Sequence, residues 1–190
     1  MGPEHRPKKV IIVGSAGAGK STLAKQLGLL LGLEVIHLDA LFWKPGWVET
    51  PRDEWRAIQQ RLIARDSWLI DGNYGRTLDL RLAAADTIIF IDLSRWLCLW
   101  RVLKRRVQYH GRVRSDIGSG CPERIDWEFF RWVFRFPTNE RPQVLKKLEQ
   151  HAPGKTVYRL RTPAEVGRFL RQMGEKAAAG ETKSGRESGR

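Results

Sequence analysis

The sequence predicts an α/β fold in which helices cover both faces of a five-stranded parallel sheet, giving three layers. Five short apolar runs rich in β-branched residues alternate along the chain with segments whose apolar residues recur at helical spacing. The 190 residues are enough for one such domain with a sizeable core. Because consecutive strands are separated by helices, the strands are expected to run parallel.

The expected strands are residues 10–13, 34–37, 68–71, 86–92 and 156–160. The expected helices are residues 20–31, 50–65, 77–84, 94–108, 126–136, 139–151 and 163–173. Thr50 or Asp53 can cap the second helix and Ser94 the fourth, and Pro137 is expected to end the fifth. Residues 38–50 are expected to form an aromatic loop and 111–122 a mobile glycine-rich loop. Residues 174–190 lack an apolar pattern and are expected to be a disordered tail.

The most specific motif follows the first expected strand. Gly14, Gly19, Lys20 and Ser21 fit the pattern G-x-x-x-x-G-K-[ST], the phosphate-binding P-loop, and a helical pattern follows it. The alternative is a glycine-rich turn with a chance lysine, but the flanking strand and helix favour the P-loop. The motif predicts that ATP binds with Mg²⁺, that Lys20 reaches the β- and γ-phosphates, and that the Ser21 hydroxyl ligates the metal. The expected nucleotide-binding residues are Gly14, Ser15, Ala16, Gly17, Ala18, Gly19, Lys20, Ser21 and Thr22.

Polar residues follow the other expected strands, and ligands bind at the carboxyl ends of parallel strands. Asp71 ends an apolar strand and is a candidate Mg²⁺ ligand through a water, or else only a turn residue. Asp39 is a candidate catalytic residue that would orient an acceptor hydroxyl, or else a cap. Arg76 is a candidate for bidentate phosphate contact. His37 fits a core histidine equally well, and no role is predicted for it.

The formal net charge of +13 is concentrated in one segment. Residues 95–114 contain seven basic residues and no acidic one, which predicts a polyanionic partner, either nucleotide phosphates or nucleic acid. A solvated helix face is the alternative. Arg101 and Arg105 begin this segment and are candidate catalytic residues that would contact the transferred phosphate.

The remaining composition limits the class of protein. No long uninterrupted apolar stretch and no apolar signal core are present, so we expect a cytoplasmic protein with no membrane partner. Two cysteines without a C-x-x-C pattern argue against a disulfide framework or a zinc cluster. Eight tryptophans are unusual for this length. Phe42, Trp43 and Trp47 could stack on a planar ligand or fill the core, whereas Trp96, Trp100, Trp127 and Trp132 are expected to be packing residues.

Several motifs carry a resemblance. The P-loop followed by Asp71-Gly-Asn-Tyr-Gly-Arg76 resembles the adenylate-kinase-like P-loop NTPases. In those proteins the P-loop is followed by the motif Asp-Gly-Phe-Pro-Arg. Arg101-x-x-x-Arg105 resembles the start of their arginine-rich lid, which implies a lid at about residues 109–125. Arg161-Thr-Pro-Ala164 falls where these kinases place their adenine-binding loop.

A closer resemblance covers residues 8–173. Four segments are similar to the FlaR-type "DNA topology modulation" proteins, which are P-loop proteins related to adenylate kinases. They are His37-Leu-Asp-Ala-Leu-Phe-Trp-Lys-Pro-Gly-Trp47, Asp71-Gly-Asn-Tyr-Gly-Arg-Thr77, Arg95-Trp-Leu-Cys-Leu-Trp-Arg-Val-Leu-Lys-Arg-Arg106 and Gly120-Cys-Pro-Glu-Arg124. The family name implies an effect on DNA topology. It does not imply a topoisomerase, because the surroundings of Tyr74, Tyr109 and Tyr158 in the sequence do not suggest a tyrosine nucleophile.

Two functions follow as hypotheses. The first is a kinase that transfers the γ-phosphoryl group of MgATP to a nucleotide, nucleoside or other small acceptor, with residues 8–173 as the kinase-like domain. The second is a nucleotide-binding regulator that engages DNA through its basic face and affects DNA topology. The location of the basic segment favours the first, because a kinase lid needs arginines at that place.

Overall fold

The central sheet has the predicted architecture. The computed structural model describes residues 7–108, 117–118, 120–121 and 127–187, with side chains described as far as Ala179. Five parallel strands lie in the order β2-β5-β1-β6-β7. They are β1 (Lys9–Gly14), β2 (Val35–His37), β5 (Trp68–Asp71), β6 (Thr87–Ile91) and β7 (Thr156–Leu160). The predicted α/β class and five-stranded parallel sheet are therefore confirmed.

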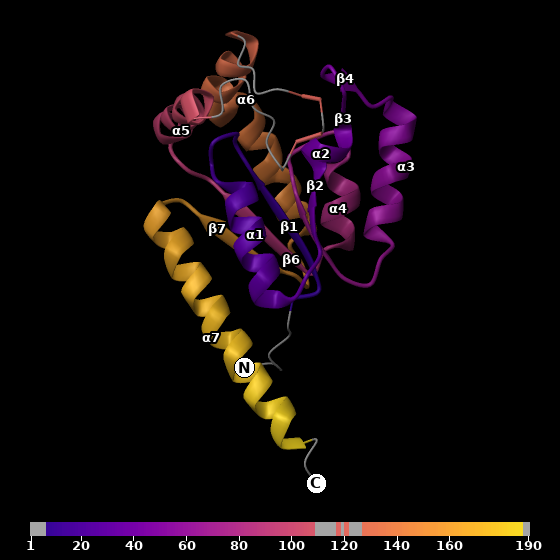
Figure 1. Ribbon diagram of the computed structural model, residues 1–190, viewed down its shortest axis with the longest axis vertical. Coiled ribbons are helices and arrows are strands. Elements are labelled where there is room, and N and C mark those ends of the chain that lie inside the picture. The colour runs from indigo at the N-terminus through magenta and orange to yellow at the C-terminus, as the bar shows by residue number, and fades with distance from the viewer. Residues whose placement is uncertain (1–6, 109–116, 119, 122–126, 188–190) are drawn as a thin grey trace.

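Helices cover both faces of this sheet (Figure 1). Alternate residues of β1 belong to two separate cores, because successive side chains of a strand point to opposite faces. Val10 and Ile12 pack with α1 (Lys20–Leu31), α5 (Arg95–Gln108) and α7 (Pro163–Glu187). Ile11 and Val13 pack with α3 (Arg52–Ile63), α4 (Leu78–Ala84) and most of α6 (Trp127–His151). The three layers of the prediction are confirmed.

The segment 38–50 is more regular than the expected aromatic loop. It forms a short helix, α2 (Leu38–Phe42), and a hairpin of β3 (Trp43–Lys44) and β4 (Val48–Glu49). Thr50 closes it: its backbone N–H and its hydroxyl both donate to the Phe42 carbonyl, at 3.0 and 2.7 Å. The hairpin turn places Gly46 and Trp47 at positive φ, and the loop prediction is corrected accordingly.

The prediction that Pro137 ends a helix is wrong. A single helix, α6, continues through both Pro137 and Pro142. An internal proline removes one backbone hydrogen bond and costs roughly 3 kcal/mol. Tertiary packing outweighs this cost, because the side chains of Val133, Phe136, Val144 and Leu148 along α6 are buried in the two cores.

The last helix is also longer than expected. Instead of ending near Met173, α7 continues to Glu187, so most of the segment predicted as a disordered tail is helical. The lack of an apolar pattern there was the basis of that prediction. Helix propensity provides the physical reason for the difference, because the segment after Gly174 is rich in alanine, glutamate and lysine and extends a turn already anchored by buried Phe169 and Met173.

None of the described helices is both long enough and apolar enough to cross a bilayer.

Candidate active site

The P-loop joins β1 to α1 and places its lysine over its own backbone. Lys20 Nζ donates to the carbonyl oxygens of Gly14 and Ser15, at 3.0 and 3.1 Å. Burial lowers the pKa of the Lys20 ammonium, while the charges of Asp39 and Asp71 oppose that effect. A triphosphate would add negative charge here and favour the charged ammonium. The loop therefore has the geometry of a phosphate-binding site.

Glycine is required in this loop because other backbone approaches it closely. Gly17 has a φ of 76°, and a Cβ atom there would lie 2.3 Å from the carbonyl oxygen of Cys98 on α5. From the same helix, Arg101 Nη1 donates to the carbonyl of Ala18 at 3.3 Å. The start of α5 is thus packed directly onto the P-loop.

A cavity of about 1050 Å³ adjoins the loop. It brings together most of the residues predicted from the sequence: Ala16, Gly17, Ala18, Gly19, Lys20, Ser21, Thr22, Asp39, Asp71, Arg101 and Arg105. Gly14 and Ser15 are buried and are not among the residues that line it. Arg76 is different. It is exposed on the turn before α4 and is not among the residues that line the cavity, so its contact with phosphate stays a prediction.

Asp71 is held at the carboxyl end of β5 by a histidine. His37 lies opposite Asp71 in the register of β2 and β5, and its Nδ1 is 2.7 Å from Asp71 Oδ1. Asp71 is buried and lines the cavity with Ser21. Sequence reasoning gave His37 no role, although its place at the end of a neighbouring strand was the available signal.

The donors near the P-loop suit magnesium. Ser21 and Asp71 contribute hydroxyl and carboxylate oxygen, the ligand type that Mg²⁺ prefers. Across the described residues, no three His, Cys, Asp or Glu side chains gather into a metal cluster. Mg²⁺ usually takes one or two carboxylates and completes its shell with phosphates and water. The residues present fit that pattern.

A buried arginine organises the loop after β5. Arg81 of α4 is fully buried, and its guanidinium donates to the carbonyls of Gly72 (2.8 Å), Asn73 and Tyr74 (3.3 Å). Burial lowers its pKa to about 10, so it stays charged at neutral pH. The sequence offered no signal for this role, because an arginine on a short helix is usually exposed.

The same loop is tied to the P-loop and to Asp39. Asn73 Oδ1 accepts from the backbone N–H of Gly14 at 2.9 Å. Tyr74, at a φ of 41°, donates its hydroxyl to Asp39 Oδ1 at 2.7 Å. Burial, reinforced by the charge of Asp39, raises the pKa of the Tyr74 phenol, so it remains a donor. The loop after β5 is thus fixed against the P-loop and positions Asp39 at the cavity.

The aromatic residues after β2 divide into two roles. Phe42 packs against Trp55 and Tyr74, with ring centroids 5.1 and 4.7 Å apart, and is a packing residue. Trp43 and Trp47 contact each other at 5.4 Å and line the cavity. Phe42 therefore fits the packing alternative, whereas stacking of Trp43 or Trp47 on a planar ligand stays a prediction.

Part of the predicted lid contacts this hairpin. The Gly46 N–H donates to the Gly120 carbonyl at 3.1 Å, and Cys121 Sγ lies 3.2 Å from the Lys44 carbonyl. Ile117 lines the cavity. Gly118 is also described, and the remaining residues of the predicted lid, including Arg112, Arg114 and Arg124, lie outside the described residues.

The expected adenine-binding loop lies at the same cavity. Pro163 and Val166, at the start of α7, line it. Thr162 caps this helix by accepting from the Glu165 N–H at 3.1 Å, and Glu165 accepts from the Arg161 N–H at 2.8 Å. These reciprocal bonds resemble a capping box and fix the start of α7.

Asp92, which follows β6, is clamped by two arginines. It accepts from Arg141 Nε at 2.8 Å and from Arg159 Nε and Nη2 at 2.9 and 2.7 Å. Burial alone would raise the pKa of Asp92, but the hydrogen bonds from Arg141 and Arg159 outweigh it and lower the pKa. This cluster joins α6 and β7 to the end of β6.

The lowered pKa of Asp92 predicts acid-sensitive stability. A depressed folded pKa adds stability that is present above the unfolded value of about 3.9 and is lost as pH falls through the folded value. Between neutral pH and acid, the free energy of unfolding of the wild type is therefore expected to fall more than that of Asp92→Asn. Urea titrations of both proteins at several pH values measure the difference. Parallel curves for the two would contradict it.

Comparisons with known proteins agree on the fold. Neither the protein-family models nor the curated proteins gave a match. Among solved structures, shikimate kinase from Acinetobacter baumannii in complex with shikimate has a TM-score of 0.57 at 14% identity, over 91% of this chain and 94% of that one. A candidate kinase from Chloroflexus aurantiacus has a TM-score of 0.52 at 15% identity, over 88% and 97%. The chain therefore has the fold of P-loop kinases.

Proposed function

We propose that this protein is a kinase that transfers the γ-phosphoryl group of MgATP to a nucleotide, a nucleoside or a similar small acceptor. One observation carries the proposal: the P-loop lysine and the Asp39–Tyr74 pair line a single cavity of about 1050 Å³. That volume is at the upper end of the usual range for ligand pockets, which leaves room for a nucleotide and a second molecule. The fold shared with kinases supports it.

The roles of the residues follow from their places around the cavity. ATP would lie on residues 14–22 with its base toward Pro163 and Val166. Lys20, Arg101 and Arg105 would neutralise charge on the transferred phosphoryl group. Ser21 and, through a water, Asp71 would hold Mg²⁺, which supplies charge neutralisation at the phosphates when bound. Asp39, held by Tyr74, would orient the acceptor hydroxyl.

We also propose membership of the FlaR-type proteins. The supporting observation is that the motifs shared with them coincide with structural contacts: the Asp71–Tyr74 loop with Asp39, and Gly120–Cys121 with the hairpin. The DNA effect that this family name implies has no support of its own in the described residues.

The test is turnover of MgATP by the purified protein against pooled nucleosides, nucleotides and sugars. A Lys20→Ala variant, prepared in the same way, excludes a contaminating kinase. Turnover that one pool stimulates and that the variant lacks supports the proposal and narrows the acceptor. Tight ATP binding with no stimulation by any pool contradicts it and favours the nucleotide-binding regulator, for which DNA binding at varied salt is the next measurement.

Asp39 gives a prediction on the acceptor. Asp39→Asn removes the carboxylate charge but keeps the shape, so we expect acceptor-stimulated turnover to fall about 100-fold while the affinity for ATP changes little. Steady-state kinetics against the stimulating pool, together with ATP titration calorimetry, separate the two effects. Asp53→Asn, on exposed α3, is the matched control. An equal loss of ATP affinity would instead place Asp39 at the nucleotide.

A further inference from the structure

Helix α5 has a second apolar face that the fold does not use. Cys98, Leu99 and Val102 point inward and are buried. Trp96, Trp100, Leu103 and Val107 recur at a spacing that places them on one side of the helix. They are 68%, 57%, 49% and 80% exposed, so the prediction that the two tryptophans are packing residues is wrong.

Helix α6 extends this face. Trp127 at its start is exposed, and Phe134 is partly exposed with its ring edge against Trp96 at 5.7 Å. The prediction of a packing role is thus wrong for Trp127 as well, whereas Trp132 is half-buried against the core. Figure 1 shows α5 beside α6 at the end of the molecule where the P-loop lies. We name the six residues Trp96, Trp100, Leu103, Val107, Trp127 and Phe134 the tryptophan surface.

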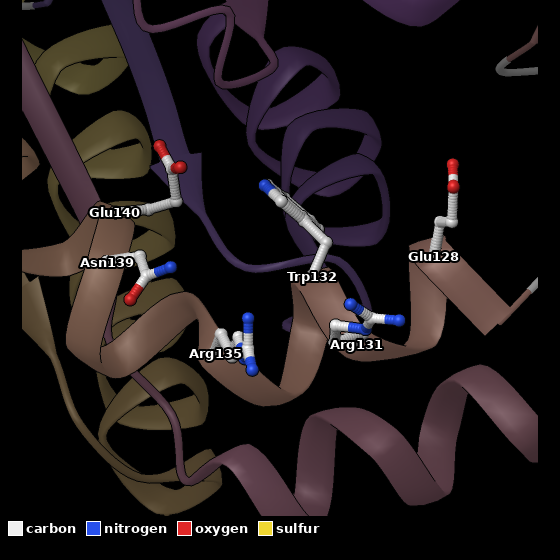
Figure 2. Close-up of a pocket in the computed structure, with 6 residues that line it drawn as sticks. All are labelled: Glu128, Arg131, Trp132, Arg135, Asn139 and Glu140. Carbon is white, nitrogen blue, oxygen red and sulfur yellow. The ribbon is translucent and has the colours of Figure 1, made fainter.

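The tryptophan surface is edged by cations. Arg95 lies over the Phe134 ring at 5.1 Å, and Lys104 lies over the Trp100 ring at 5.1 Å. Helix α5 contains no acidic residue, and of its five basic residues Arg101 and Arg105 line the cavity, whereas Arg95, Lys104 and Arg106 do not. Figure 2 shows Arg131 and Arg135 on α6, at a small pocket of about 260 Å³ whose lining also includes Glu128 and Glu140. The surface therefore combines exposed apolar side chains with an excess of positive charge.

This combination favours an anionic partner over a second copy of the chain. Two copies meeting through α5 would bring their basic residues together, which like-charge repulsion opposes. Leu103 and Val107 offer aliphatic surface, which bases of a nucleic acid do not stack on. A bilayer interface accepts tryptophan rings at headgroup level, aliphatic groups at the acyl boundary and Lys or Arg beside the lipid phosphates.

We propose that the tryptophan surface docks this protein onto an anionic lipid bilayer. No residue proposed for phosphoryl transfer belongs to it: Arg101 and Arg105 of α5 line the cavity, and the residues of the tryptophan surface do not. The sequence predicted no membrane partner because it lacks a spanning segment, but surface association needs only an amphipathic face. The proposal does not depend on the protein being a kinase.

The experiment is flotation of the full chain with vesicles of phosphatidylcholine alone, or of phosphatidylcholine mixed with phosphatidylserine. We expect flotation with the mixed vesicles only, weakened by salt and accompanied by a blue shift of tryptophan fluorescence. Trp96→Ser with Trp100→Ser should weaken binding by at least about tenfold. Leu29→Ser, which changes an apolar residue 87% exposed on α1, is the matched control and should float like the wild type.

A second variant keeps the proposal testable if the protein with Trp96→Ser and Trp100→Ser does not fold. Lys104→Glu changes an exposed side chain and should weaken binding by at least about fivefold, the effect of one basic residue near an anionic surface. Flotation with neither vesicle, or equal flotation with both, would overturn the proposal. A dimer that sediments as such and that the tryptophan variant dissociates would overturn it in favour of a second copy of the chain.

Discussion

Lys20→Ala is expected to lower acceptor-stimulated turnover of MgATP by about 1000-fold, the upper range for loss of one preorganised charge at a transition state. The ammonium lies at the centre of the P-loop, where it donates to the carbonyls of Gly14 and Ser15. The substitution takes away the ammonium that would contact the β- and γ-phosphates, so the affinity for ATP should also fall, by about tenfold or more.

The control is Lys146→Ala, which removes a lysine of the same charge from the exposed side of α6. Circular dichroism of all three proteins shows whether the fold is kept. Turnover by Lys20→Ala within about tenfold of the wild type would mean that this lysine is not the phosphate-binding group. Equal losses in both variants would point to an effect of net charge and not of position.

The sequence predicted the sheet well because its signals are local. Each strand is a short apolar run, and the P-loop has fixed spacing. The first and last residues of β5, β7 and α1 are therefore the ones predicted from the sequence. Parallel pairing then places the strand ends at one edge, which is why Lys20, Ser21, Asp39 and Asp71 meet at one cavity.

Features that depend on tertiary contacts could not be predicted in this way. Pro137 breaks a helix by local rules, but buried neighbours on both sides keep α6 continuous. Trp96 and Trp100 have the spacing of core residues, and only the position of α5 on the P-loop shows that the opposite face of this helix is the buried one. Arg81 and Arg76 are five residues apart, and nothing in the sequence indicates which of them turns inward.

Arg81→Met is the other substitution expected to have a large effect. It should lower the free energy of unfolding by about 3 kcal/mol, because it leaves the buried carbonyl of Gly72 and the partly buried carbonyls of Asn73 and Tyr74 without their charged donor. Urea unfolding measures this change. Arg56→Met, on the exposed side of α3, is the matched control and is expected to change stability by less than about 0.5 kcal/mol.

The same variant tests whether Arg81 acts through the loop that it holds. That loop directly follows Asp71 and places the Tyr74 hydroxyl on Asp39, so its loosening should reduce kcat for phosphoryl transfer even where the protein remains folded. Arg81→Lys retains the charge and reaches fewer carbonyls, so it should recover part of the stability and part of the kcat together. If the lysine variant restored stability but left kcat at the level of Arg81→Met, the geometry of the fork, and not its charge, would be what positions the two carboxylates. If Arg81→Met were as stable and as active as the wild type, the buried arginine would have no part in positioning them.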